Sequence, residues 1–122
     1  SWNNEVNEIK KRLSLIQEMG GKDKIKRQHD AGRSTVRERI IALLDKNSFK
    51  EIGSLTGSSE YDEDGKLKSL LAANSVIGHG KINNSPVAIY GDDFTVRGGA
   101  ADAAIWEKSV AAERFANEYE FH

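Results

Sequence analysis

The segment Gly91–Phe115, GDDFTVRGGAADAAIWEKSVAAERF, decides the fold that we predict for this chain. Residues 87–90 before it, VAIY, are β-prone and predict a short buried strand. Residues 100–118 are rich in Ala, Glu, Lys and Arg and contain no Gly or Pro, which is typical of a helix. Gly98-Gly99 stands between the two and allows a tight change of direction. We therefore expect a strand that turns at the two glycines into a helix.

This arrangement brings unpaired backbone N–H groups together at the start of a helix. Such groups can bind an anion, or stabilise negative charge that develops on a carbonyl oxygen during a reaction. The candidate catalytic groups are therefore the backbone N–H donors of Gly98, Gly99 and Ala100. The alternative is that the glycines only form a tight turn that lets the helix pack on the sheet. So short a pattern favours this alternative when it is taken alone.

The composition is that of an ordinary globular protein, with 122 residues, of which 38% are hydrophobic and 30% charged. This length suits one small domain or part of a larger one. The chain has no cysteine, which excludes disulfides, zinc–thiolate sites and thiol nucleophiles and fits a cytoplasmic protein. No apolar run is long enough to cross a membrane, so we expect no membrane partner.

The charge is divided unevenly along the chain. Residues 1–46 hold 11 Lys and Arg against 7 Asp and Glu, whereas residues 47–122 hold 7 against 12. A basic first part indicates a phosphate-bearing partner, either nucleic acid or a nucleotide-like cofactor. The alternative is that both parts simply present solvated helix faces. We predict a helical segment over 1–46 and the beginning of a second unit over 47–122.

The first 46 residues predict three helices. A narrow apolar stripe indicates a first helix, which could pack on its own domain or lie on a partner subunit; its members are Trp2, Val6, Ile9, Leu13 and Ile16. Residues 22–31 form a short basic helix that Gly32 ends. Thr35 and Glu38 form a capping box before a third helix. Its predicted buried face consists of Val36, Ile40, Leu43 and Leu44.

Arginines cluster at the start of the third helix. Arg33, Arg37 and Arg39 lie around its first turns, where positive charge opposes the helix dipole. That small cost indicates a use such as bidentate binding of a phosphate group, so these three are the candidate substrate-binding residues. The alternative is that they pair with Asp30, Asp45 or acidic residues of a neighbouring subunit.

The remaining segments predict strands. A strand follows Asn47-Ser48, and residues 57–73 read as a mobile hairpin or surface loop. Residues 76–82 and 86–90 predict two antiparallel strands joined by the turn Asn83-Asn84-Ser85. With the helices, this order predicts a mixed α/β fold.

Several ordered motifs together resemble the amino-terminal part of the biotin-dependent acyl-CoA carboxyltransferases, the β subunits of propionyl-CoA and methylcrotonyl-CoA carboxylases. The resemblance covers about residues 19–118. Its most specific parts are Gln28-His29-x-x-Gly32-Arg33-x-Thr35-x-Arg37-Glu38-Arg39-Ile40, Leu43-Leu44-Asp45, Ser48-Phe49-x-Glu51, and Asp93-Phe94-Thr95-Val96-x-Gly98-Gly99.

The resemblance implies a partial crotonase-like fold, made of repeated ββα units, preceded by helices. It implies transfer of a carboxyl group from carboxybiotin, held on a carrier domain, to the α-carbon of an acyl-CoA. Backbone donors would stabilise the enolate charge of this reaction without a protein nucleophile, and no metal is expected in this segment. The implied partners are acyl-CoA, biotin carboxyl carrier and biotin carboxylase subunits, and further copies of the carboxyltransferase subunit.

The sequence departs from the family where relatives usually have Ser after the two glycines, because Ala100 can offer only its backbone there. The family's second glycine-rich loop and second homologous domain are not in these residues, so we expect an amino-terminal fragment that is inactive alone. The alternatives are a carboxyltransferase subunit of an acyl-CoA decarboxylase, a basic helix-turn-helix over residues 22–44 that binds nucleic acid, and an oligomerisation module built on residues 2–16.

Overall fold

A computed structural model describes residues 1–96, 98 and 106–120 of the chain. Its helices and strands are, in order, α1 (Asn3–Gln17), α2 (Lys22–Asp30), α3 (Val36–Leu43), β1 (Lys50–Ile52), β2 (Gly57–Tyr61), β3 (Leu67–Ala72), β4 (Ser75–Ile82), β5 (Ser85–Asp92) and α4 (Trp106–Glu118). The mixed α/β fold expected from the sequence is confirmed.

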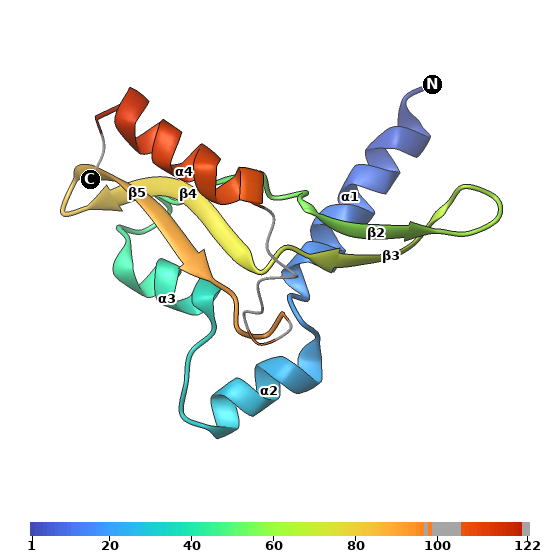
Figure 1. Cartoon of the computed structure of the whole chain (residues 1–122), viewed down its shortest axis with the longest axis horizontal. Helices are drawn as coiled ribbons and strands as arrows, with labels where there is room; N and C mark the ends of the chain where they lie inside the picture. Colours follow the sequence, from blue (N-terminus) through green and yellow to red (C-terminus); the bar gives the residue numbers. More distant parts are fainter. Residues whose placement is uncertain (97, 99–105, 121–122) are drawn as a thin grey trace.

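An antiparallel sheet with the strand order β1-β4-β5 forms the centre of the molecule (Figure 1). In its register, Ile77 of β4 pairs with Ile52 on one side and Tyr90 on the other. The β4–β5 turn has positive φ values of 48° and 68° at Asn83 and Asn84, conformations that Asn tolerates in tight hairpins. The predicted pair of antiparallel strands is therefore confirmed, with its turn.

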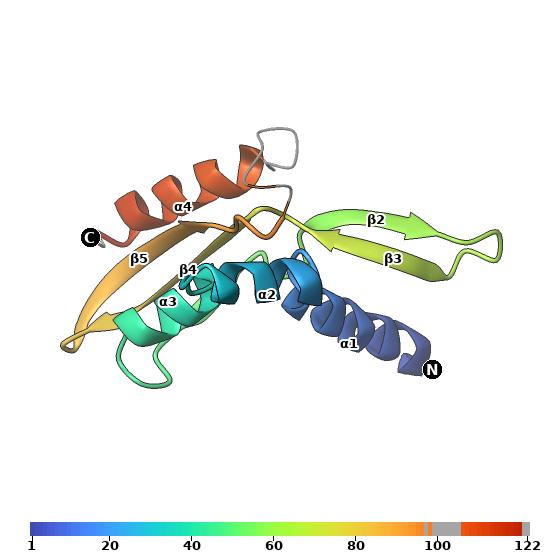
Figure 2. The ribbon, with the colours of Figure 1, turned by 90° about the horizontal axis from the view of Figure 1, so that it is seen from below.

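Helices α3 and α4 cover opposite faces of this sheet (Figures 1 and 2). On the α3 face, Ile40, Leu44 and Val76 form a buried cluster. Gly91 of β5 permits the close approach of α3, since a Cβ atom there would lie 2.5 Å from Cγ2 of Val36. On the other face, His79 of β4 stacks on Phe115 of α4, with 5.1 Å between the ring centroids.

A second, smaller core joins α1 to the β2–β3 hairpin, which extends to one side of the central sheet (Figure 1). Its buried members are Ile16 of α1 and Leu70 and Ala72 of β3, with Leu15 packed against them. The sequence interpretation of residues 57–73 as a hairpin is confirmed. Its buried Leu67, Leu70 and Ala72 show that it is more than a polar surface loop.

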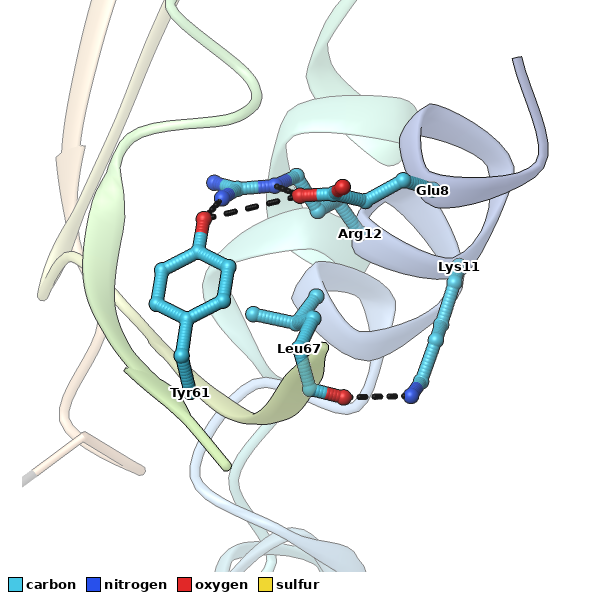
Figure 3. A network of polar contacts seen from close by, with 5 residues as sticks. All are labelled: Glu8, Lys11, Arg12, Tyr61 and Leu67. Atoms are coloured by element: carbon cyan, nitrogen blue, oxygen red, sulfur yellow. Dashed lines mark hydrogen bonds and ion pairs between the residues drawn. The ribbon is translucent and has the colours of Figure 1, made fainter. Parts of the chain in front are cut away.

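Polar contacts at the outer end of the hairpin hold it against α1 (Figure 3). Nζ of Lys11 donates a hydrogen bond of 2.6 Å to the backbone oxygen of Leu67. The guanidinium of Arg12 contacts both the hydroxyl of Tyr61 and the carboxylate of Glu8, the latter at 3.2 Å. Hairpin and helix therefore form one packed unit from the small core outward.

The apolar stripe predicted along the first helix is buried only at Ile16, and its other members are exposed: Trp2, Val6, Ile9 and Leu13. In α3, the burial predicted for Leu43 is wrong. Leu43 was placed on the buried face of α3, but 56% of its surface is exposed. The helix ends at Leu43, and Leu44 continues in an extended conformation with ψ of 156°. This backbone change turns Leu44 into the core and leaves Leu43 beside an open groove between α3 and β5.

The described part of α4 is only half buried. Val110, Ala112, Phe115 and Ala116 are partly covered, whereas Ala111 and Tyr119 are exposed. The start predicted at residue 100 lies outside the described residues. Within the parts of the chain that the structure describes, no helix is both long and apolar enough to cross a bilayer.

We predict that Leu70→Ala weakens the fold far more than Leu71→Ala. Leu70 is 8% exposed in the small core, whereas its neighbour Leu71 points to the other face and is 41% exposed. Emptying the buried position should lower the free energy of unfolding by about 2–5 kcal/mol. Urea unfolding of the two variants measures the difference, and equal losses would show that the small core contributes little.

Candidate functional site

The turn Asp93–Val96 leads from β5 toward Gly98 and is buried at every residue except Phe94. The exposed fractions of Asp93, Thr95 and Val96 are 2%, 2% and 0%. Oδ1 of Asp93 accepts hydrogen bonds from the backbone N–H of Thr95, at 2.9 Å, and from its hydroxyl, at 2.6 Å. The N–H of Asp93 donates in turn to the backbone oxygen of Asn74, at 2.7 Å. These contacts fix the conformation of the turn that precedes Gly98.

The corner between α1 and α2 packs directly on this turn. The N–H of Gly20 donates a hydrogen bond of 3.0 Å to the hydroxyl of Thr95. A Cβ atom at Gly20 would lie 1.7 Å from the backbone oxygen of Thr95, so only glycine allows the two main chains to come this close. The N-terminal helices are therefore part of the site's framework.

A pocket of about 420 Å³ opens between the start of α3 and the same turn. Arg33 and Arg39 line it from the α3 side, where both are exposed. Phe94 lines it from the turn side, as do Asp92 and Asp93. The pocket thus combines two cations and an exposed aromatic ring with two carboxylates, one of which is already engaged by Thr95.

Arg37 is the third predicted substrate-binding arginine, and it lies elsewhere. Its guanidinium forms a bidentate ion pair with Glu51 of β1, with N–O distances of 2.7 and 2.9 Å. Both side chains are largely buried, and Nε of Arg37 has no hydrogen-bond partner among the described residues. The pair joins α3 to the edge of the sheet, so the structure brings together Arg33 and Arg39 but not Arg37.

The predicted capping box is confirmed and is braced by His29. The hydroxyl of Thr35 accepts from the N–H of Glu38, and the carboxylate of Glu38 accepts from the N–H of Thr35 at 2.8 Å. Nε2 of His29 lies 2.9 Å from Oε1 of the same carboxylate. The hydrogen bond from the Thr35 backbone, with help from His29, lowers the pKa of Glu38. These contacts shape the loop that carries Arg33.

Of the three candidate catalytic donors, Gly98 lies within the described residues. It is exposed and has a φ of 62°, in the left-handed region that favours glycine. Gly99 and Ala100 lie outside the described residues. Their proposed role as backbone donors therefore stays a prediction.

Lys108 of α4 is a buried charge that sequence reasoning missed. It is 6% exposed, and its Nζ donates a hydrogen bond of 2.8 Å to the backbone oxygen of Ser75. Burial lowers the pKa of Lys108; the charge of Glu51 opposes this shift, and that of Arg37 adds to it. A lysine in an Ala- and Glu-rich helix reads as a solvent-facing residue, so no local signal would have revealed it.

Comparison with known proteins places this geometry in a family. Residues 27–120 match the carboxyl transferase domain. The propionyl-CoA carboxylase carboxyltransferase subunit of Haloferax mediterranei is 33% identical over 84% of this chain and 20% of its own length. The methylmalonyl-CoA decarboxylase subunit alpha of Veillonella parvula is 31% identical over 88% and 21%.

A solved structure supports the same assignment. The transcarboxylase 12S crystal structure with methylmalonyl-coenzyme A bound matches with a TM-score of 0.67 and 32% identity, over 83% of this chain and 20% of that one. The fold is thus a partial crotonase-like fold, as expected. The chain belongs to the carboxyl transferase domain family, and it spans about one fifth of the length of the curated relatives it matches.

We predict that Lys108 makes stability depend on pH. Its folded pKa lies below the ordinary value of 10.5, so between the two the unfolded chain binds more protons than the folded one. The free energy of unfolding should therefore rise with pH across this interval. Urea unfolding at several pH values measures the rise. It should vanish in Lys108→Met and persist in Lys10→Met, an exposed helical lysine; an unchanged rise in Lys108→Met would contradict the assignment.

Proposed function

We propose that this chain is part of a carboxyltransferase that moves a carboxyl group from carboxybiotin to the α-carbon of an acyl-CoA. Membership of the carboxyl transferase domain family supports the reaction class. The observation that carries the proposal for this chain is the pocket in which Arg33 and Arg39 face the turn that leads to Gly98. It offers a cationic surface for phosphate beside a backbone suited to hold an oxyanion.

The reaction demands stabilisation of negative charge on two oxygens. Carboxybiotin would supply the carboxyl group, and the ureido group left behind would carry negative charge on its oxygen and accept the α-proton of the acyl-CoA. Loss of the α-proton places enolate charge on the thioester oxygen. We assign backbone N–H groups of Gly98, Gly99 and Ala100 to one of these oxygens, because fixed donors act strongly where water is excluded. The turn Asp93–Val96 supports this role because hydrogen bonds within it fix the conformation of the chain that leads toward Gly98.

The finer parts of the proposal concern partners and context. We propose biotin carboxyl carrier and biotin carboxylase subunits as partners, further carboxyltransferase subunits in the assembly, and a cytoplasmic location. The division into a helical segment at 1–46 and a carboxyltransferase domain that begins at 47 is part of the proposal. The family assignment favours this function over a nucleic-acid-binding helix-turn-helix or an oligomerisation module.

A decarboxylase subunit is the second candidate. One relative is named a methylmalonyl-CoA decarboxylase subunit alpha and is 31% identical, close to the identity of the carboxylase relative. Both enzymes would use the same enolate chemistry in opposite directions. Assays of the full-length subunit with free biotin and malonyl-type or simple acyl-CoA substrates would tell which direction dominates.

We predict that Arg33→Ala and Arg39→Ala raise the KM for acyl-CoA in the full-length subunit by about tenfold each, the typical contribution of one charge-assisted contact. Arg37→Ala is the matched control, since its guanidinium is engaged by Glu51. That variant should lower the melting temperature and leave KM unchanged. Unchanged KM in the first two variants would mean that Asp92 and Asp93 merely neutralise these arginines.

We predict that a side chain at Gly98 lowers kcat on the order of 10²-fold, the typical loss of one oxyanion donor. The positive φ of Gly98 disfavours alanine. An alanine there would shift the backbone to another conformation and turn the N–H away. Ala100→Ser is the control and should be nearly neutral, because the proposed donor there is the backbone. Steady-state kinetics and melting temperature are measured together on both variants. A Gly98→Ala enzyme with normal kcat would remove the oxyanion role and leave a simple turn.

A further inference from the structure

Lys108 is a buried ammonium group that the proposed chemistry does not use. A methionine of similar length would fill the same space without the cost of burying a charge. The lysine instead donates a hydrogen bond of 2.8 Å to a specific acceptor, the backbone oxygen of Ser75. A costly group with a single precise contact points to a positioning role.

The acceptor of Lys108 stands next to the acceptor of Asp93. Asn74 and Ser75 are consecutive residues at the start of β4; the oxygen of Asn74 accepts the N–H of Asp93, and that of Ser75 accepts Nζ of Lys108. Asp93 precedes Gly98 in the sequence, and Lys108 follows it. Asp93, before Gly98, and Lys108, after it, are thus tied to the adjacent peptide groups of Asn74, which precedes β4, and Ser75, which begins it.

The charges of the ion pair that joins α3 to β1 also act on Lys108. Glu51 of β1, itself paired with Arg37 of α3, is the acidic group whose charge acts on Lys108. Lys108 therefore connects α4 to the start of β4, and its Cε lies near Gly53, the residue that follows β1.

We propose that Lys108 is a positioning residue for the backbone donors at Gly98, acting through the paired anchors on Asn74 and Ser75. This inference rests on the carboxyl transfer proposed above. Lys108 touches no reacting atom in this scheme. Its loss changes the geometry of the flanks of Gly98 while the sheet itself stays intact.

Amide hydrogen exchange on the 122-residue chain tests the anchor without any enzyme assay. In Lys108→Met the amides of Asp93 and Thr95 should exchange about tenfold faster, because Ser75, the neighbour of the residue that accepts the Asp93 N–H, loses its bond to α4. The amide of Asp45, which donates to the backbone oxygen of Lys81 at the other end of β4, should keep its rate. Equal acceleration at all three amides, or none at Asp93 and Thr95, would overturn the proposal.

Two further variants keep the test decisive. Lys108→Arg retains a cationic donor and should preserve slow exchange at Asp93 and Thr95. Val110→Ala removes partly buried atoms from the same helix without touching the anchor, so it should not accelerate these amides selectively. Should Lys108→Met fail to fold, comparison of Lys108→Arg with Lys108→Gln gives the same contrast, and equal rates in those two would count against the anchor.

Kinetics of the full-length subunit complete the experiment. Lys108→Met should lower kcat on the order of 10²-fold with the KM for acyl-CoA unchanged, since a displacement of about 1 Å has that effect. Lys108→Arg should recover most of the rate. Normal kcat in Lys108→Met would overturn the positioning role. Selective exchange in a subunit whose unaltered form transfers no carboxyl group would instead overturn the proposed function and leave the anchor standing.

Discussion

The rest of the site depends on one contact between two main chains, that of Gly20 with Thr95. The residues are 75 positions apart, and no side chain larger than hydrogen fits between them. Through Thr95 the contact reaches Asp93, and through Asp93 it reaches the start of β4. The N-terminal helices therefore act on the site through backbone geometry, and their packing and the order of the site are coupled.

The sequence predicted those features that are written in short spans of residues. Thr35 and Glu38 stand three apart and form the capping box, and Asn83-Asn84 forms the hairpin turn, because helix caps and tight turns need only local chemistry. The strands of the sheet followed from β-prone runs bounded by turns. The predicted burial of Leu43 is wrong because helical periodicity assumes that the helix continues, whereas the backbone becomes extended at Leu44.

The parts that could not be predicted depend on where distant segments meet. The pairing of Arg37 with Glu51, the burial of Lys108 and the approach of Gly20 to Thr95 all join residues at least 14 positions apart. Arg37 and Arg39 look alike in the sequence, yet one is engaged by β1 and the other faces a pocket. Tertiary packing alone distinguishes them.

Many residues that carried the family resemblance serve the framework. Asp45 accepts the N–H groups of Asn83 and Asn84, Ser48 accepts that of Lys81, and Glu51 holds Arg37. Motifs of this kind identify a fold reliably because each of their residues makes a specific long-range contact. Their presence explains how so short a segment remains recognisable, while the groups proposed for chemistry are few.

The two separate cores have a consequence for how the molecule tolerates change. One core lies between α1 and the β2–β3 hairpin, and the other between α3 and the sheet. The hairpin tip between Tyr61 and Leu67 is exposed, and it lies on the opposite side of the molecule from α3 and β5 (Figure 2). Insertions at that tip would change the outline of the molecule while the register of its candidate site is preserved.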